Sequence, residues 1–180
     1  MDKTPMTFRF PGPARAFFLV LFSTAALAGL SCHTVSGQEK GHYMTVTKIV
    51  DGDTFWADDG TPVGIKVRMI GLDAPESRRT GRKEIGYFGQ ESKDYLSAWL
   101  TGKKVRLEYD VGRYDQYHRT LAYVFLEDGT FVNAKLLKRG YAVVLTVPPN
   151  VKYADEFLKL QRKARRHKRG LWEESLDQTR

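Results

Sequence analysis

The fold of this chain is decided by a stretch that reads YMTVTKIVDGDTFWA (residues 43–57). Two runs rich in β-branched and aromatic residues, 43–50 and 53–57, flank the pair Asp51-Gly52. An Asp-Gly pair between such runs is a strong signal for a tight turn between antiparallel strands. We therefore expect a β-hairpin at the start of the folded domain.

Further strand and helix patterns follow this hairpin. Three short apolar runs predict additional strands at 65–72, 105–109 and 121–126. Helical spacing of apolar residues, followed closely by glycine, predicts helices at 90–100, 131–139 and 153–168. Five closely spaced strands with helices inserted among them favour a mainly β (α+β) barrel over a parallel sheet with alternating helices.

Carboxylates gather at two turns of this pattern. Asp53 follows the hairpin turn, where Asp and Gly suit the backbone without any further role. The run Asp73-Ala74-Pro75-Glu76 has the acidic spacing and the proline of a helix start. Basic residues and Gly81 come next, rather than an amphipathic pattern, so we expect no helix there. Helix capping therefore explains this run less well than a functional site does.

Two arginines lie at apolar strands. Arg68 interrupts the strand predicted at 65–72, and Arg119 immediately precedes the strand predicted at 121–126. A buried guanidinium is costly unless an anion pairs with it. An ion pair with Asp53 or Asp73 would meet that need, and so would a phosphate held between the arginines and a metal ion. Oxygen ligands without a cluster of His or Cys favour calcium over zinc as that metal.

The first 32 residues have the pattern of an export signal. Lys3, Arg9 and Arg15 precede an apolar run at 16–30 that ends in small residues and is too short for a spanning helix. We therefore expect an exported protein, which is secreted, periplasmic or anchored to a membrane as a lipoprotein.

Cys32, the single cysteine, comes directly after the apolar run. A lipoprotein signal places its lipidated cysteine there, although Gly29 and Leu30 differ from the usual lipobox. The alternative is ordinary cleavage after Ala28, within a small-x-small pattern. Under either interpretation we expect a mature domain that has no disulfide and is stabilised by its core.

The chain is basic, with a formal net charge of +8. Residues 1–32 carry three basic residues and one acidic residue, so their removal would leave +6. Such a charge favours nucleic acid or an anionic membrane as a partner, although a solvated surface also explains it. Basic residues cluster at Arg78, Arg79, Arg82 and Lys83, and again over 162–169. The second cluster lies late on a predicted helix, where positive charge also suits the helix dipole.

Taken together, the order and spacing of these motifs resemble those of the staphylococcal nuclease-like (thermonuclease) family. The motifs are Val50-Asp51-Gly52-Asp53-Thr54, Arg68 five residues before Asp73-Ala74-Pro75-Glu76, Tyr117-His118-Arg119 before Leu121-Ala122-Tyr123, and the late Gly170-Leu171-Trp172. The resemblance covers residues 43–175, between a linker at 33–42 and a tail at 176–180. It implies an OB-fold barrel of five strands with three helices.

The resemblance also implies a calcium site beside a water-handling carboxylate. Asp53 and Asp73 would bind the ion through their carboxylates, and Ala74 through its main-chain carbonyl. Glu76 would hold or deprotonate the attacking water.

Phosphate binding is implied at three further positions. Arg68 and Arg119 would stabilise the negative charge that builds up on the phosphate, and Tyr117 would hydrogen-bond a terminal phosphate. The family cleaves single-stranded DNA and RNA with little sequence preference and leaves 3′-phosphate ends. We therefore expect a calcium-dependent endonuclease that acts on single-stranded or melted DNA and RNA, as a monomer without an obligate protein partner.

Four positions depart from the family pattern. Gln116 stands where the pattern has a lysine, and His118 where it has a glycine. Thr146 and Pro148 are expected at the positions of two tyrosines that cover the base. These departures predict altered affinity for the substrate rather than altered chemistry.

Two other functions stay open. A nucleic-acid-binding OB-fold module without catalysis would be expected to lack one or more of the five charged positions, yet all five are present in this chain. A structural protein of the cell envelope would explain the leader and the charge, but not the clustered carboxylates.

Overall fold

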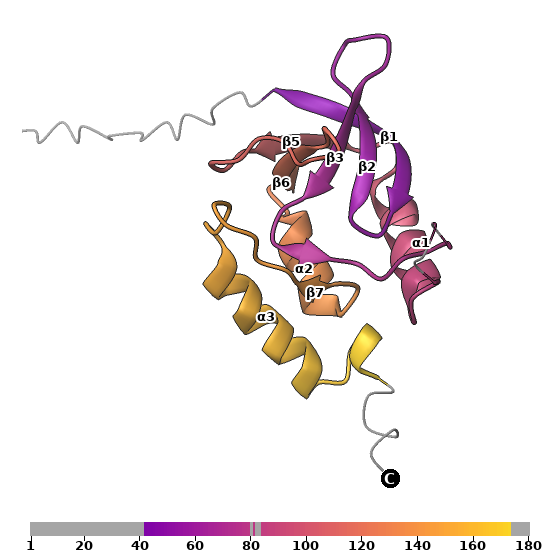
Figure 1. The fold of residues 1–180 in the computed structure, drawn as a ribbon, viewed down its shortest axis with the longest axis vertical. Helices are drawn as coiled ribbons and strands as arrows, with labels where there is room; N and C mark the ends of the chain where they lie inside the picture. The colour runs from indigo at the N-terminus through magenta and orange to yellow at the C-terminus, as the bar shows by residue number, and fades with distance from the viewer. Residues whose placement is uncertain (1–41, 80, 82–83, 174–180) are drawn as a thin grey trace, which may run out of the picture. The chain divides into compact units, whose positions relative to one another are not determined.

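The computed structural model describes residues 42–79, 81 and 84–173 (Figure 1). Several sequence predictions fall outside these residues: the export signal at 1–32 with Cys32, the linker as far as residue 41, Arg82, Lys83 and the tail at 176–180. In the part of the chain that is described, no helix is both long enough and apolar enough to cross a membrane.

Five strands form a closed barrel (Figure 1). They are β1 (Tyr43–Asp51), β2 (Thr54–Asp58), β3 (Ile65–Met69), β5 (Lys104–Glu108) and β6 (Thr120–Leu126). Their order around the barrel is β1-β2-β3-β6-β5, and β5 pairs with β1 to close it. The β3–β6 pair is parallel and the other pairs are antiparallel. The predicted mainly β (α+β) OB-fold barrel is confirmed.

The predicted hairpin forms from β1 and β2. Asp51 pairs with Thr54 across the turn. Along β1, Met44 and Val46 are buried whereas Thr45 and Thr47 are exposed, as expected for a strand with one face toward the core.

The strand predicted at 65–72 is wrong at its end. The chain breaks after β3, and β4 (Leu72–Asp73) pairs with β7 (Val143–Val144) in a separate two-stranded sheet. Gly71 has a φ of 81°, and a Cβ at this position would lie 2.5 Å from the ring of Phe157. The break therefore depends on a glycine in the left-handed region and on a ring that is distant in the sequence.

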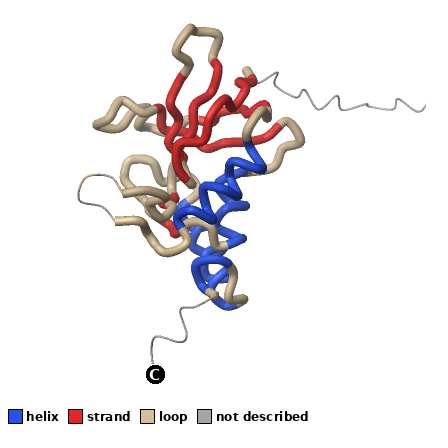
Figure 2. The backbone as a smooth tube through the Cα atoms, turned by 90° about the vertical axis from the view of Figure 1, so that its right-hand side faces the viewer, coloured by secondary structure: helices blue, strands red, loops and turns tan. Residues whose placement is uncertain are grey.

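Three helices gather beside the barrel (Figure 2). They are α1 (Gly89–Leu100), α2 (Val132–Arg139) and α3 (Ala154–Arg166), and a short 3₁₀ helix, η1 (Gly170–Trp172), follows α3. These positions confirm the three predicted helices. α1 packs against β1, while α2 packs against both β6 and α3. Residues 74–76 have no regular structure, and no helix starts at the acidic run, as expected.

One hydrophobic core joins the barrel to the helices. Phe55 and Val67 contribute from the barrel, and Leu96, Leu136 and Phe157 contribute from the three helices. All five side chains are fully buried, so the helices form an integral part of the fold.

Candidate active site

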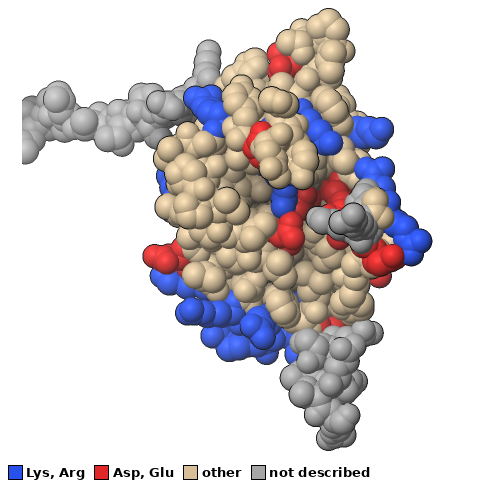
Figure 3. Space-filling model, viewed as in Figure 1, with Lys and Arg blue, Asp and Glu red and all other residues tan. Residues whose placement is uncertain are grey.

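All five predicted charged residues line one surface cavity of about 290 Å³. Its wall is built from the β1–β2 turn, β3, β4 with the segment after it, and the residue before β6. The predicted residues in this wall are Asp53, Arg68, Asp73, Glu76 and Arg119, with Ala74 among them. In Figure 3, acidic and basic side chains lie next to each other in a hollow on this face of the molecule.

Asp53 is the most buried carboxylate of this cavity. Its Oδ1 accepts a hydrogen bond from the Thr54 hydroxyl at 2.8 Å, and its Oδ2 accepts one from the Ala74 main-chain nitrogen at 2.8 Å. Burial raises the pKa of Asp53 above its ordinary value, against the opposing effects of Arg68 and of these hydrogen bonds. The carboxylate is thus fixed in place, and Arg68 and these hydrogen bonds offset only part of the effect of burial.

Arg68 lies between Asp53 and Asp73 and forms an ion pair with each. Its NH1 is 2.5 Å from Asp53 Oδ2, and its NH2 is 2.6 Å from Asp73 Oδ1. NH1 also donates to the carbonyl oxygen of Leu72 at 3.1 Å. The ion pair with Asp53 or Asp73, one of the two explanations considered for Arg68, is therefore present. It also orients the guanidinium toward the cavity.

The hairpin turn is pressed against the acidic run. A Cβ on Gly52 would lie 2.6 Å from that of Ala74, so this approach requires glycine. The turn places Asp51 in the same cavity, where its Oδ1 accepts hydrogen bonds from the main-chain nitrogens of Gly52 at 2.9 Å and Ser77 at 3.3 Å. The sequence pattern predicted only a turn at Asp51. The candidate site residue Asp53, two positions later, indicated that this turn lies at a functional site.

Burial raises the pKa of Asp51, and the nearby carboxylates of Asp53 and Glu76 raise it further. Glu76 is half-buried, and its carbonyl accepts a hydrogen bond from the Gly86 main-chain nitrogen at 2.9 Å. Gly89, at the start of α1, packs so closely on the same carbonyl that a Cβ there would overlap it. The backbone of Glu76 is therefore held by two neighbouring segments.

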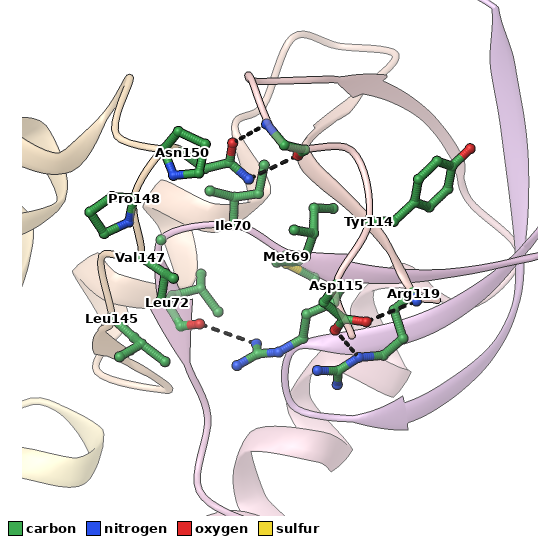
Figure 4. Close-up of a pocket in the computed structure, with 15 residues that line it drawn as sticks. Met69, Ile70, Leu72, Tyr114, Asp115, Arg119, Leu145, Val147, Pro148 and Asn150 are labelled. Carbon is green, nitrogen blue, oxygen red and sulfur yellow. Dashed lines mark hydrogen bonds and ion pairs between the residues drawn. The ribbon is translucent and has the colours of Figure 1, made fainter. Parts of the chain in front are cut away.

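Arg119 is oriented by Asp115, a residue for which the sequence pattern predicted no role. Arg119 Nε donates to Asp115 Oδ2 at 2.6 Å, and the main-chain nitrogen of Arg119 donates to Oδ1 at 3.0 Å (Figure 4). The ring of Tyr117 lies 5.4 Å from the Arg119 guanidinium carbon. Tyr117 is exposed, and it is not among the described residues that line the cavity. His118 has a φ of 58°, a left-handed conformation that favours glycine.

A second cavity of about 310 Å³ adjoins the first, and both arginines line both cavities. Its other walls are mainly apolar, and Leu145, Val147 and Pro148 form one side of it (Figure 4). Thr146 does not line this cavity, whereas its neighbours Leu145 and Val147 do, and Pro148 lines it as well. The correspondence of Thr146 and Pro148 to two base-covering tyrosines stays a prediction.

Asn150 fixes the loop that carries this apolar side. Its Oδ1 accepts a hydrogen bond from the Gly112 main-chain nitrogen at 2.7 Å, and its Nδ2 donates to the Gly112 carbonyl at 2.9 Å (Figure 4). Two segments that border the cavity are thereby joined, so the cavity is largely preformed.

The oxygen atoms of the first cavity suit a hard cation. Carboxylates of Asp53 and Asp73, with Thr54 nearby, are the donor types that calcium prefers. Burial is the main cause of the raised pKa of Asp53, and a bound cation would stabilise the charged form of this carboxyl group. Within residues 42–79, 81 and 84–173, no three Asp, Glu, His or Cys side chains already form a metal-binding group. Arg68 lies between the two aspartates that would bind the ion.

These features define an OB-fold barrel with a charged cavity beside a preformed apolar one. The family model described as staphylococcal nuclease homologue matches residues 66–174, which is more than half of the chain. The chain belongs to the staphylococcal nuclease family.

Curated relatives agree with this assignment. The chain is 40% identical to a thermonuclease of Staphylococcus hyicus over 128 residues, which cover 71% of this chain and 73% of the relative. It is 38% identical to a thermonuclease of Staphylococcus intermedius over 135 residues, covering 74% and 78%. Endonuclease YncB of Bacillus subtilis (strain 168) is 33% identical over 140 residues, covering 77% and 65%.

Proposed function

We propose that this protein is a calcium-dependent endonuclease that hydrolyses phosphodiester bonds of single-stranded or melted DNA and RNA and leaves 3′-phosphate ends. The observation that carries this proposal is the convergence of Asp53, Arg68, Asp73, Glu76 and Arg119 on one cavity. The names of the relatives, thermonuclease and endonuclease, support the same class of reaction.

The side chains of the cavity divide the chemistry among them. Asp53, Asp73 and the Ala74 carbonyl would hold the calcium ion, which would supply positive charge next to the phosphate. Glu76 would accept a proton from the attacking water through its carboxylate. Arg68 and Arg119 would bind the non-bridging phosphate oxygens, whose negative charge increases during the displacement.

Low sequence preference fits the cavity beside the arginines. Its lining is mainly apolar, including Leu145 and Val147, and such groups contact a base without reading its hydrogen-bonding edge. Recognition would therefore rest mainly on the phosphate and on the exposed face of an unpaired base.

A cleavage assay tests the proposal. The purified protein is incubated with single-stranded DNA, duplex DNA and RNA, in calcium or in a chelator. We expect calcium-dependent cleavage, fastest on single strands, and product ends that a polymerase extends only after phosphatase treatment. Binding without cleavage in calcium would instead support the non-catalytic OB-fold module.

Two variants test the assigned residues. Arg68→Gln and Glu76→Gln should each reduce kcat by about 10²–10³-fold while the far-ultraviolet circular dichroism spectrum is retained. Arg79→Gln and Glu91→Gln are matched controls, because both residues are exposed and neither lines the cavity. Comparable activity in all four variants would show that the site is wrongly placed.

Export is proposed on the pattern of residues 1–32 alone. Fractionation of producing cells should find the protein outside the cytoplasm. Metabolic labelling with a radioactive fatty acid should label the protein but not a Cys32→Ala variant if Cys32 carries a lipid anchor. An unlabelled exported protein would favour cleavage after Ala28.

A further inference from the structure

A second charged depression lies where α2 and α3 end. We call it the basic groove. Its volume is about 610 Å³, and the described residues that line it are Lys135, Lys138, Arg139, Tyr141, Lys168, Arg169, Gly170 and Glu173. Five of these are cationic and one is acidic. None of them lines either cavity of the candidate active site.

Within the described residues no ion pair reaches any of the five cations of the basic groove, although Lys135 interacts electrostatically with Asp128. Lys135 Nζ lies 4.2 Å from the ring centroid of Trp99, and the Arg139 guanidinium lies 5.8 Å from that of Tyr95. Arg169 Nη1 donates to the Lys138 carbonyl at 3.2 Å. With five cations and one carboxylate among its described lining residues, the groove carries an excess of positive charge that attracts anions.

Helix dipoles explain only part of this arrangement. Lys138 and Arg139 occupy the last turn of α2, where positive charge is favourable. Lys135 lies earlier in that helix, and Lys168 and Arg169 lie beyond the end of α3. Arg169 is also explained by a helix end, because its guanidinium donates to the Lys138 carbonyl in the last turn of α2. Lys135 and Lys168 are the two groove cations that this interaction does not explain.

Lys168 also has an unfavourable backbone conformation. Its φ of 48° lies in the left-handed region, which glycine adopts at the ends of helices without steric cost. Lys168 therefore carries some backbone strain, and it also lines the basic groove. Glycine at this position would remove both the strain and the charge.

The walls of the groove are held together by main-chain contacts. The Leu171 main-chain nitrogen donates to the Gly140 carbonyl at 2.9 Å. A Cβ on Gly140 would overlap the Arg169 carbonyl, and one on Gly170 would overlap the Gly140 carbonyl. The two helix ends therefore pack at a fixed distance, and the groove exists before any ligand binds.

Tyr141 supplies an aromatic surface among the cations. It is partly exposed, and its ring stacks on that of Tyr95 with centroids 4.0 Å apart and planes 8° apart. Positive charge with a fixed aromatic ring is the combination that binds single-stranded nucleic acid. Lys and Arg also gather over α3 on the face shown in Figure 3.

We propose that the basic groove binds the phosphate backbone of a single nucleic-acid strand, separately from the site of hydrolysis. This inference rests on the proposed nuclease function for its choice of ligand. A concave groove with an aromatic ring suits a strand better than the flat surface of a bilayer. A strand held there would remain near the enzyme between cleavage events, so long substrates would bind more tightly than short ones.

A triple variant, Lys138→Ala, Arg139→Ala and Lys168→Gly, tests the proposal. The control is Lys48→Ala, Lys103→Ala and Lys104→Ala, which removes the same charge at exposed positions outside the groove and both cavities. Binding of a 30-nucleotide single strand is measured by fluorescence anisotropy in a chelator, at several salt concentrations. The groove variant should bind about tenfold more weakly, and its salt slope should fall by about 2, since each lost contact to a single strand contributes about 0.7.

Three outcomes separate the proposals. Equal affinity and equal salt slope in the two triple variants would overturn the nucleic-acid groove. The proposal would also be overturned if the groove variant lost binding to phosphatidylglycerol vesicles but still bound DNA, because the ligand of the groove would then be a membrane. Calcium-dependent cleavage of a trinucleotide should be unchanged in the groove variant. If the wild-type protein did not cleave the trinucleotide, the nuclease function would be refuted, but the binding result for the groove would still hold.

Discussion

Asp115 holds Arg119 at two points. Its Oδ2 accepts from Arg119 Nε at 2.6 Å, and its Oδ1 accepts from the Arg119 main-chain nitrogen at 3.0 Å. Burial alone would raise the pKa of Asp115, but the hydrogen bonds from Arg119 outweigh it and hold that pKa below its ordinary value. With Nε engaged, the two terminal nitrogens of Arg119 are the donors left for a phosphate.

Asp115 is therefore expected to act as a positioning residue. Asp115→Asn should reduce kcat/KM by about tenfold, because a misplaced guanidinium contacts the phosphate less well. Arg119→Gln should reduce it by about 10²–10³-fold, since the contact itself is lost. Steady-state kinetics on a short single strand measures both, with Asp128→Asn in an exposed turn as the control. An unchanged kcat/KM in Asp115→Asn would mean that Arg119 is oriented without it.

Arg68 would compete with the proposed calcium ion for the same two carboxylates. Arg68→Gln removes a positive charge that lies within 2.6 Å of both Asp53 and Asp73. We expect calcium to bind this variant about tenfold more tightly, since electrostatic repulsion of the ion is relieved, even though catalysis is lost. Isothermal titration calorimetry measures the affinity, and Arg79→Gln controls for the change in net charge. Weaker calcium binding in Arg68→Gln would show that the arginine helps to assemble the calcium site.

The apolar cavity is lined mainly by aliphatic groups, and Tyr114 is the aromatic residue among its described lining. Val147 lines this cavity and is 58% exposed, so a larger ring can be accommodated at its edge. Val147→Tyr should tighten binding of a dinucleotide in chelator by about tenfold, because stacking of one base contributes about 1–3 kcal/mol. Val63→Tyr, on an exposed loop outside the cavity, is the control. No difference between the two variants would place the base elsewhere.

The sequence predicted those features that depend on local patterns. The hairpin at 43–57 was predicted because strand alternation and an Asp-Gly turn agree, and the five charged residues were found because they occur in ordered motifs. The break at Gly71 depends on packing against Phe157, which no local pattern reveals. The places of Leu145 and Val147 in the apolar cavity were not predicted, since they follow the pairing of β7 with β4, which joins segments distant in the sequence.

The close packing at Gly140 predicts a specific loss of stability. Gly140 has a φ of 78°, and a Cβ there would overlap the Arg169 carbonyl. Gly102 has a similar φ of 76°, but nothing lies within 4 Å of its Cβ position. Gly102→Ala should therefore cost only the backbone strain, about 1–2 kcal/mol of unfolding free energy, whereas Gly140→Ala should cost more because the helix ends must separate.

Urea unfolding followed by circular dichroism measures both losses. Because the same separation would widen the basic groove, Gly140→Ala should also weaken binding of a 30-nucleotide single strand, whereas Gly102→Ala should not. Equal losses of stability in the two variants would show that the main chain near Arg169 can relax. Reduced stability with unchanged strand binding would show that the groove does not depend on the fixed distance between the two helix ends.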